Sequence, residues 1–358
     1  MRYRETELLA PTDVGASGTK TIDLVLSDII SAITVEFSAI CPSSITIQEV
    51  AAANITKIEL VNGSDVLYSL TGMQAHAMDF FDTGRQYICG GSYVPAWGLL
   101  ATLRLNFGRY LFDPELALNP KQFSNPQLKI SFDEDAAVAS AETNSLCVWA
   151  NVFDERAVSP KGFLMNKGLK DYTPVANATE ETDLPTDYPL RKLMVQMRVP
   201  DLWWGGIISS LKITEDNDKR IPINMNAAQL EHWLHEFFGE YYDGIIADLD
   251  TTTGVDIYHA PTQGVKPRGD FYCDSDVADN IPFGYRNKYC TTTMEGYTVM
   301  DIAGTMPHGC MCIPFGDQKD IADWYDARGK SLIMKLKAGG SIGASETFRV
   351  VTQQYRTY

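Results

Sequence analysis

Gly339–Gly343 has the sequence Gly-Gly-Ser-Ile-Gly, which matches the nucleophile-elbow pattern of serine hydrolases. Such an elbow needs a strand before the serine, a helix after it, and an acid and then a histidine downstream. Only 15 residues follow Gly343, and none of them is Asp or His. The pattern therefore favours a glycine-rich turn between two strands, and we predict no catalytic residue.

His232 and His235 lie three residues apart on a predicted amphipathic helix, where they could share one face and bind a metal ion. Their spacing fits neither of the common zinc patterns with a glutamate between or beside two histidines. No third ligand is evident nearby. A polar helix face opposite Trp233, Leu234 and Phe237 is the better interpretation.

His308, Cys310 and Cys312 form a second group of possible metal ligands, since two thiolates and an imidazole suit zinc. The two cysteines alternate with Met311 and Ile313, which is the period of a strand. A strand with small residues on its second face accounts for them. We therefore predict no metal and no cofactor.

Trp203 and Trp204 could stack on sugars or anchor a protein interface, and burial inside a domain is a comparable alternative. Arg2 and Arg4 stand out in a chain with a formal net charge of −16. We take these four residues as candidate interface residues.

The charge of the chain argues against binding of nucleic acid by the folded body, because an acidic surface repels phosphates. Seven cysteines without framework spacing favour a reducing compartment. The N-terminus has no apolar signal segment, and no apolar run reaches the ~20 residues of a membrane span. The hydrophobic content of 45% predicts a folded globular protein.

Three segments of the first half of the chain recur in the same order in the second half. Each pair shares strand-like alternation, a short helix, or a Phe-Gly or Glu-Thr dipeptide. The pairs are Ile58–Phe81 with Leu211–Phe238, Leu103–Gly108 with Met311–Gly316, and Leu128–Thr143 with Leu332–Thr347. The sequence offset between matched residues is 157 at the end of the first pair and 208 in the second pair. The second copy therefore gains 51 residues, within about 241–307.

This doubling predicts an all-β fold of two tandem eight-stranded antiparallel jelly-roll (β-sandwich) domains, each with one short helix. We expect an N-terminal arm over 1–20, a first jelly roll over 21–153, a Pro-rich acidic linker over 154–189 and a second jelly roll over 190–358. The insertion at about 241–307 is rich in Gly, Asp, Tyr and Thr, and predicts long loops.

The tandem arrangement resembles the double jelly-roll major capsid proteins of tailless icosahedral viruses of the adenovirus and PRD1 lineage. It is most similar to the coat proteins of small bacteriophages with an internal membrane. The resemblance rests on the repeated segments and covers the chain from about Thr21 onward.

The resemblance implies a non-enzymatic coat subunit, made in the host cytoplasm and located in the virion. It implies a homotrimer, a pseudo-hexagonal capsomer that contacts neighbouring capsomers, minor capsid proteins and a penton protein. The insertion would form outward loops or subunit contacts. The N-terminal arm with Arg2 and Arg4 would face the interior, near an internal membrane.

The alternative is a secreted two-domain jelly-roll protein that binds glycans, or a hydrolase of the peptide N-glycanase type. Such a protein would place carboxylates or aromatic residues in the groove between its domains. The missing signal segment and the odd number of cysteines argue against it.

Overall fold

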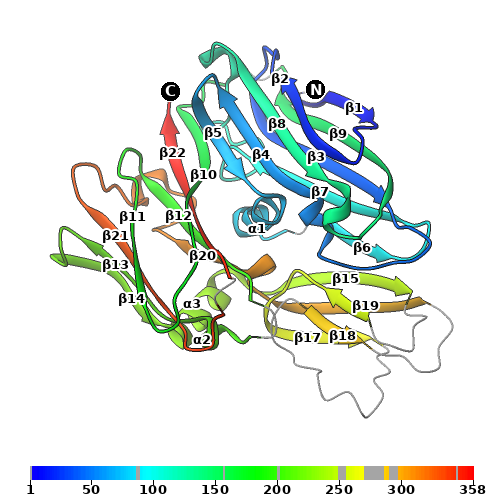
Figure 1. Ribbon diagram of the computed structural model, residues 1–358. Coiled ribbons are helices and arrows are strands. Elements are labelled where there is room, and N and C mark those ends of the chain that lie inside the picture. Colours follow the sequence, from blue (N-terminus) through cyan, green and yellow to red (C-terminus); the bar gives the residue numbers. More distant parts are fainter. Residues whose placement is uncertain are drawn as a thin grey trace.

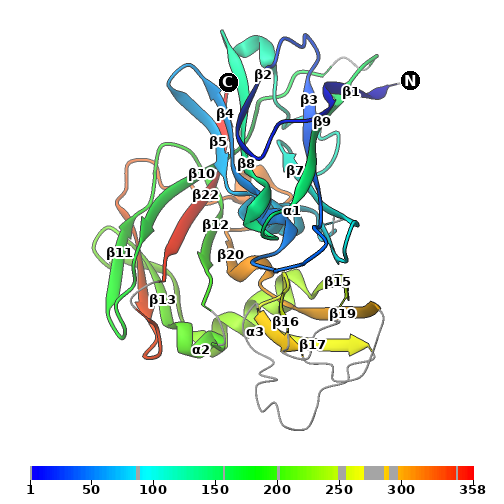
Figure 2. The same cartoon turned by 45° about the vertical axis from the view of Figure 1, so that its right-hand side comes forward.

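A computed structural model describes residues 2–358 except 86–88, 156–157, 200–201, 249–254, 270–285, 290–296 and 344–345. The molecule is mostly β, with two sandwiches side by side and a short helix, α1 (Gly72–Thr83), between them (Figures 1 and 2). The prediction of a mostly β chain is confirmed.

The first sandwich has two layers, with strand orders β1-β9-β3-β7 and β2-β8-β4-β5. Alternating apolar residues such as Leu128, Ile130 and Phe132 point into the core between the layers. The strands are β1 (Tyr3–Thr12), β2 (Ser17–Asp23), β3 (Ile30–Ile40), β4 (Ile55–Asn62), β5 (Asp65–Leu70), β7 (Gly98–Asn106), β8 (Pro126–Asp133) and β9 (Glu142–Phe153).

The second sandwich repeats this plan, with strand orders β10-β22-β12-β20 and β11-β21-β13-β14. Each strand takes the place of its counterpart in the first sandwich, so the doubling seen in the sequence is a doubling of topology. The strands are β10 (Gly162–Tyr172), β11 (Thr179–Asp183), β12 (Leu190–Met197), β13 (Ile208–Glu215), β14 (Arg220–Asn226), β20 (Cys310–Pro314), β21 (Leu332–Ala338) and β22 (Phe348–Thr357).

Each sandwich has a helix directly after its fifth strand, α1 in the first and α3 (Ala227–Phe238) in the second. Both helices begin with a capping box. The side chain of the residue just before the helix accepts a hydrogen bond from the backbone N–H of a glutamine three residues on, and the glutamine side chain accepts one from the backbone N–H of that first residue. The pairs are Thr71 with Gln74 and Asn226 with Gln229. A one-turn helix, α2 (Trp204–Ile207), precedes β13.

Two parallel strand pairs join the two halves of the chain, in addition to the antiparallel pairing within each jelly roll. β5 pairs with β10, where Tyr68 faces Asn166. β6 (Cys89–Tyr93) pairs with β15 (Tyr241–Asp248), where Gly91 faces Ile245. Both large sheets therefore run from one half of the chain into the other.

The predicted arm and linker both contribute strands. In the arm, β1 pairs with β9 and β2 pairs with β8, and Gly15 makes the turn between them at a φ of 77°. In the linker, β10 pairs with β22 and β11 pairs with β21. The prolines that suggested a linker flank these strands and do not interrupt them, at positions Pro160, Pro174, Pro185 and Pro189.

The insertion, predicted as loops, extends the sheet of the first sandwich. β19 (Tyr297–Thr305) lies between β15 and β17 (Gln263–Gly269), and their apolar side chains form a small core with Tyr93. β16 (Val255–Tyr258) and β18 (Arg286–Tyr289) form a separate pair. Residues 249–254, 270–285 and 290–296 of this segment lie outside the described residues.

Candidate functional site

The α1 helix is the element that both sandwiches share. Its capping box fixes its start, and Gly84, at a φ of 65°, ends it by donating its N–H to the Phe80 carbonyl. Nine of its residues are buried, among them Phe80 and Phe81, because the helix has protein on every side. It therefore fixes how the two halves sit against each other.

Asp82, near the end of α1, is held by three side chains of the second sandwich. Arg191 Nη1 lies 2.5 Å from Asp82 Oδ1, Lys192 Nζ donates to the same oxygen, and Gln353 Nε2 lies 3.0 Å from Oδ2. The Asp82, Arg191 and Lys192 side chains are at most 2% exposed. Burial raises the pKa of Asp82, but the Lys192 and Arg191 charges outweigh it and lower the pKa overall.

Lys192 also binds the end of the helix itself. Its Nζ donates to the Phe81 carbonyl at 2.7 Å, where the helix leaves carbonyls without intrahelical partners. A cation is favourable at this end of a helix. Together, Asp82, Arg191, Lys192 and Gln353, the junction ion cluster, fasten α1 to β12 and β22.

Asp79 lies one turn earlier and accepts a hydrogen bond from Asn106 Nδ2 at 2.6 Å. Burial raises its pKa to about 7, against the Asn106 hydrogen bond and the Arg104 charge. Raised carboxyl pKa values are common at catalytic sites. Asp79 is only 2% exposed, so its carboxyl supports the packing of α1 against the first sandwich.

The predicted metal candidates do not come together. His232 and His235 are exposed on α3, whereas Cys310 and Cys312 are buried on β20, facing the core that includes α1. Burial raises the pKa of both thiols, to about 12 for Cys312, so they stay protonated. Among the described residues, no three His, Cys, Asp or Glu side chains could hold a metal ion.

His308 is buried and contacts another histidine. Its Nε2 lies 2.7 Å from His76 Nδ1 of α1, and His76 Nε2 lies 3.2 Å from the Tyr241 hydroxyl. The three side chains therefore link α1 of the first sandwich to the turn before β20 and to the insertion.

The glycine-rich stretch lies in the turn after β21, as predicted. A Cβ on Gly339 would lie 2.0 Å from the Gly206 carbonyl oxygen, and Gly340 approaches the Asn177 side chain. Glycine is needed at position 339 because the backbone of α2 comes so close. This packing gives the glycine at position 339 a structural role.

The two tryptophans have opposite environments. Trp204 is 2% exposed, and its Nε1 donates to the Ala227 carbonyl at 2.8 Å, so burial excludes it from a surface contact. Trp203 is 56% exposed, and its ring lies over Gly205, where a Cβ would come within 2.2 Å of it. Trp203 remains a candidate interface residue.

The two N-terminal arginines also differ. Arg4 pairs with Asp28 and with Asp154, at 3.3 Å for the latter, which fastens β1 beside the start of the second half. Arg2 is exposed, and its carbonyl accepts the Asp154 N–H. Large apolar side chains are also exposed, at Val25, Trp97, Tyr110, Leu111, Val175, Ile221, Phe237 and Tyr242.

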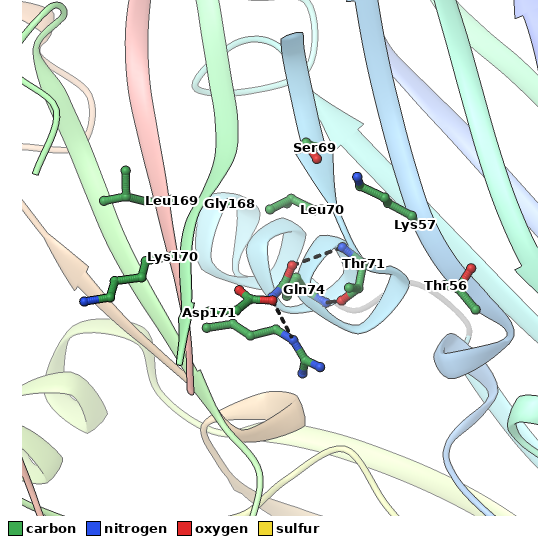
Figure 3. A pocket seen from close by; sticks show the side chains of 11 residues that line it. Thr56, Lys57, Ser69, Leu70, Thr71, Gln74, Gly168, Leu169, Lys170 and Asp171 are labelled. Carbon is green, nitrogen blue, oxygen red and sulfur yellow. Dashed lines mark hydrogen bonds and ion pairs between the residues drawn. The ribbon is translucent and has the colours of Figure 1, made fainter. Parts of the chain in front are cut away.

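A groove of about 490 Å³ lies between the sandwiches where β5 and β10 diverge (Figure 3). The start of α1, with the reciprocal Thr71 and Gln74 hydrogen bonds, lies beside it. Among the described residues that line it, Asp171 is the one carboxylate, and it lies 3.5 Å from Arg349 Nε. A glycan hydrolase would use a second carboxylate, which these described lining residues do not supply.

The junction ion cluster did not emerge from the sequence, although two local signals could have indicated it. Asp82 lies at the helix end where a negative charge is unfavourable. Arg191 and Lys192 lie in a strand whose residues are otherwise apolar or amide. Charged residues in such places need buried partners.

No family model and no curated protein matches the chain, whereas solved structures match it along its length. The major capsid protein P2 of bacteriophage PM2 matches 99% of this chain and 98% of its own, with a TM-score of 0.56 and 11% identity. The major capsid protein of STIV matches 100% and 97%, with a TM-score of 0.61 and 12% identity. The PBCV-1 virus capsid chain matches 99% and 93%, with a TM-score of 0.57 and 10% identity.

The chain therefore has the double jelly-roll fold of viral major capsid proteins. This confirms, as a likeness of fold, the resemblance that the repeated segments indicate. In the part of the chain that the structure describes, no helix is long and apolar enough to cross a membrane.

Proposed function

We propose that this chain is the major coat subunit of a tailless icosahedral virus. The observation that carries the proposal is the full-length match of both sandwiches, in order, to capsid proteins of three viruses. A match of one sandwich alone would suit many functions, because jelly rolls are widespread. Two jelly rolls in tandem along one chain point far more specifically to a capsid protein than one jelly roll does.

In this proposal, three copies form a homotrimer whose six jelly rolls give a pseudo-hexagonal tile. Such a tile needs the two jelly rolls of each chain in a fixed orientation. The parallel strand pairs and the junction ion cluster supply that rigidity. The exposed apolar side chains, Trp203 among them, provide contact area between copies.

The proposed partners are neighbouring capsomers, minor capsid proteins and a penton protein, with an internal membrane reached through the N-terminal segment and Arg2. The labelled strands of the insertion, β15, β17, β18 and β19, lie together at one edge of the molecule (Figure 1), a position suited to outward loops or subunit contacts. No nucleic acid, metal or cofactor is required. The proposed location is the virion, after synthesis in the host cytoplasm.

The alternative of a glycan-binding protein or peptide N-glycanase-like hydrolase needs convergent carboxylates or stacked aromatic residues between the domains. In the groove, the described lining residues contribute one carboxylate, Asp171, which pairs with Arg349.

Size-exclusion chromatography with light scattering tests the proposal. We expect a stable species of three times the 39.8 kDa chain mass, or larger assemblies. A strict monomer that binds or cleaves a glycan would refute it.

A further inference from the structure

Three of the five histidines of the chain are buried in one place, and none of them has a role in the proposed function. His76, His259 and His308 are at most 2% exposed. They lie on α1, on the segment before β17 and on the turn η4 (Pro307–Gly309) before β20. We call these residues the histidine junction.

The contact between His76 and His308 can hold only one proton. The hydrogen bond between His76 Nδ1 and His308 Nε2, at 2.7 Å, requires one nitrogen to be bare. When both rings are protonated, each of these nitrogens bears a proton, so the bond is lost and two positive charges face each other. His308 Nδ1 is buried without a hydrogen-bond partner among the described residues, so a proton placed there is also unsatisfied.

Among the described residues, the charged groups that act on His308 and His259 add to this cost. Arg198, beyond β12, adds a positive charge that acts on His308 and His259, and its own partner is Glu49 at 2.7 Å. Burial comes first among the causes that lower the pKa of His308, and it lowers that of His259 to about 4. Asp243 on β15 is the carboxyl beside this region, bonded to the Ala260 N–H at 2.8 Å.

Burial raises the pKa of Asp243 to about 7, so acid makes this carboxyl neutral just when the histidines would need a negative charge. Within the described part of the chain, the Gln196 amide, the Tyr241 hydroxyl and the Cys310 thiol also face the junction, from β12, β15 and β20. Farther along α1, Asp79 and Asp82 are engaged with Asn106 and the junction ion cluster.

The turn that contains His308 has an unfavourable backbone conformation, which its contacts must hold in place. Met306, His308 and Gly309 have φ values of 55°, 56° and 70°, which is costly for the two non-glycine residues. The turn is held by the His308 N–H to the Ala260 carbonyl at 2.7 Å and by the Thr262 hydroxyl to the Met306 carbonyl at 2.8 Å. Loss of the histidine contact leaves this turn with fewer restraints.

We propose that the histidine junction is an acid-sensitive latch: proton uptake by His76 and His308 separates α1 from the 306–309 turn and loosens the insertion from the first sandwich. The latch is a property of the chain itself and does not depend on the coat function. In a shell, it would make the contact between the two jelly rolls of each subunit respond to acid.

Hydrogen–deuterium exchange of the full chain between about pH 7 and pH 4.5, corrected for intrinsic rates, tests the latch. For peptides of α1 and of 306–309, we expect the opening constant to rise as the pH falls below about 6.5. The rise should be about tenfold per pH unit for each proton by which uptake at the histidines exceeds the proton that Asp243 releases on opening. The variant with His76→Gln and His308→Gln should lose this pH dependence. The matched control with His232→Gln and His235→Gln, both exposed on α3, should behave as wild type.

Wild-type protection that is unchanged down to about pH 4.5, or that is lost equally in the buried-site variant, would overturn the proposal. Should that variant fail to fold, imidazole NMR of the wild type gives the decision. We expect the two rings to protonate only as α1 loses protection. Protonated rings in a chain whose α1 stays protected would refute the latch.

Discussion

Asp82 and Lys192 meet across the boundary of the two jelly rolls, with side chains 2% and 0% exposed. Lys192 also binds the Phe81 carbonyl, so a single cation pairs with a carboxylate and satisfies a carbonyl in the last turn of the helix. Such a buried pair does not by itself indicate high stability, because removing two charges from water is costly. It does make the orientation of the halves specific, since either charge left alone would be strongly unfavourable.

Asp82→Asn should lower the free energy of unfolding by about 3–5 kcal/mol, because Arg191 and Lys192 lose their buried countercharge. Urea unfolding measures this loss. The control is Asp218→Asn, which removes the exposed partner of Lys212 and should change the free energy of unfolding far less, because solvent screens this pair. Equal effects of the two substitutions would contradict the role of the junction ion cluster.

Asp79→Asn should change how stability depends on pH. The pKa of Asp79 is raised from 3.8 to about 7 in the folded chain, so between these values the folded state binds the extra proton. Asp79 therefore stabilises the fold at low pH, and this contribution is lost as pH rises toward 7, at about 1.4 kcal/mol per pH unit.

The stability of Asp79→Asn relative to wild type should accordingly rise between about pH 5 and pH 7 and stay level above that. Urea midpoints at successive pH values measure the difference. Parallel curves for the two proteins would show that Asp79 does not titrate in this range.

Gly72→Ala should destabilise the chain, although alanine normally favours a helix over glycine. The added Cβ would lie 2.2 Å from the Ala52 carbonyl oxygen and 2.7 Å from that of Ile55, and backbone atoms cannot move aside cheaply. We expect a loss of about 1–3 kcal/mol. In Gly98→Ala the Cβ meets nothing within 4 Å, so its thermal midpoint should stay near that of wild type.

Trp203→Ala and Trp204→Ala should separate assembly from folding. Trp204→Ala removes a core side chain and its hydrogen bond to Ala227, and should cost about 3–5 kcal/mol in unfolding. Trp203→Ala should leave monomer stability nearly unchanged and weaken trimer formation in sedimentation at decreasing concentration. A Trp203 variant that assembles as wild type would remove this residue from the proposed interface.

The repeated scaffold could be predicted because its signals are local. Alternation in Leu128–Phe132 marks a strand, and the spacing of Trp233, Leu234 and Phe237 marks an amphipathic helix, without knowledge of the rest of the chain. The strands in 1–20 and 154–189 were missed because their polar residues and flanking prolines resemble those of loops. They become strands only when β9 and β22 supply their pairing partners.

The site itself could not be predicted, since its contacts join distant residues. Asp82 and Lys192 are 110 positions apart, and His76 and His308 are 232 apart. Neither separation matches a helix or strand period or a known motif, so the sequence alone does not indicate these contacts. The two tryptophans are adjacent in sequence, yet one is buried and one exposed, because Trp204 begins α2 and Trp203 precedes it.

Negative-stain electron microscopy of the purified full chain shows whether it assembles as a coat subunit. We expect particles or tiles with a hexagonal outline, built from three two-lobed subunits. A uniform population of single two-lobed molecules, at every protein concentration and without larger assemblies, would contradict the coat proposal.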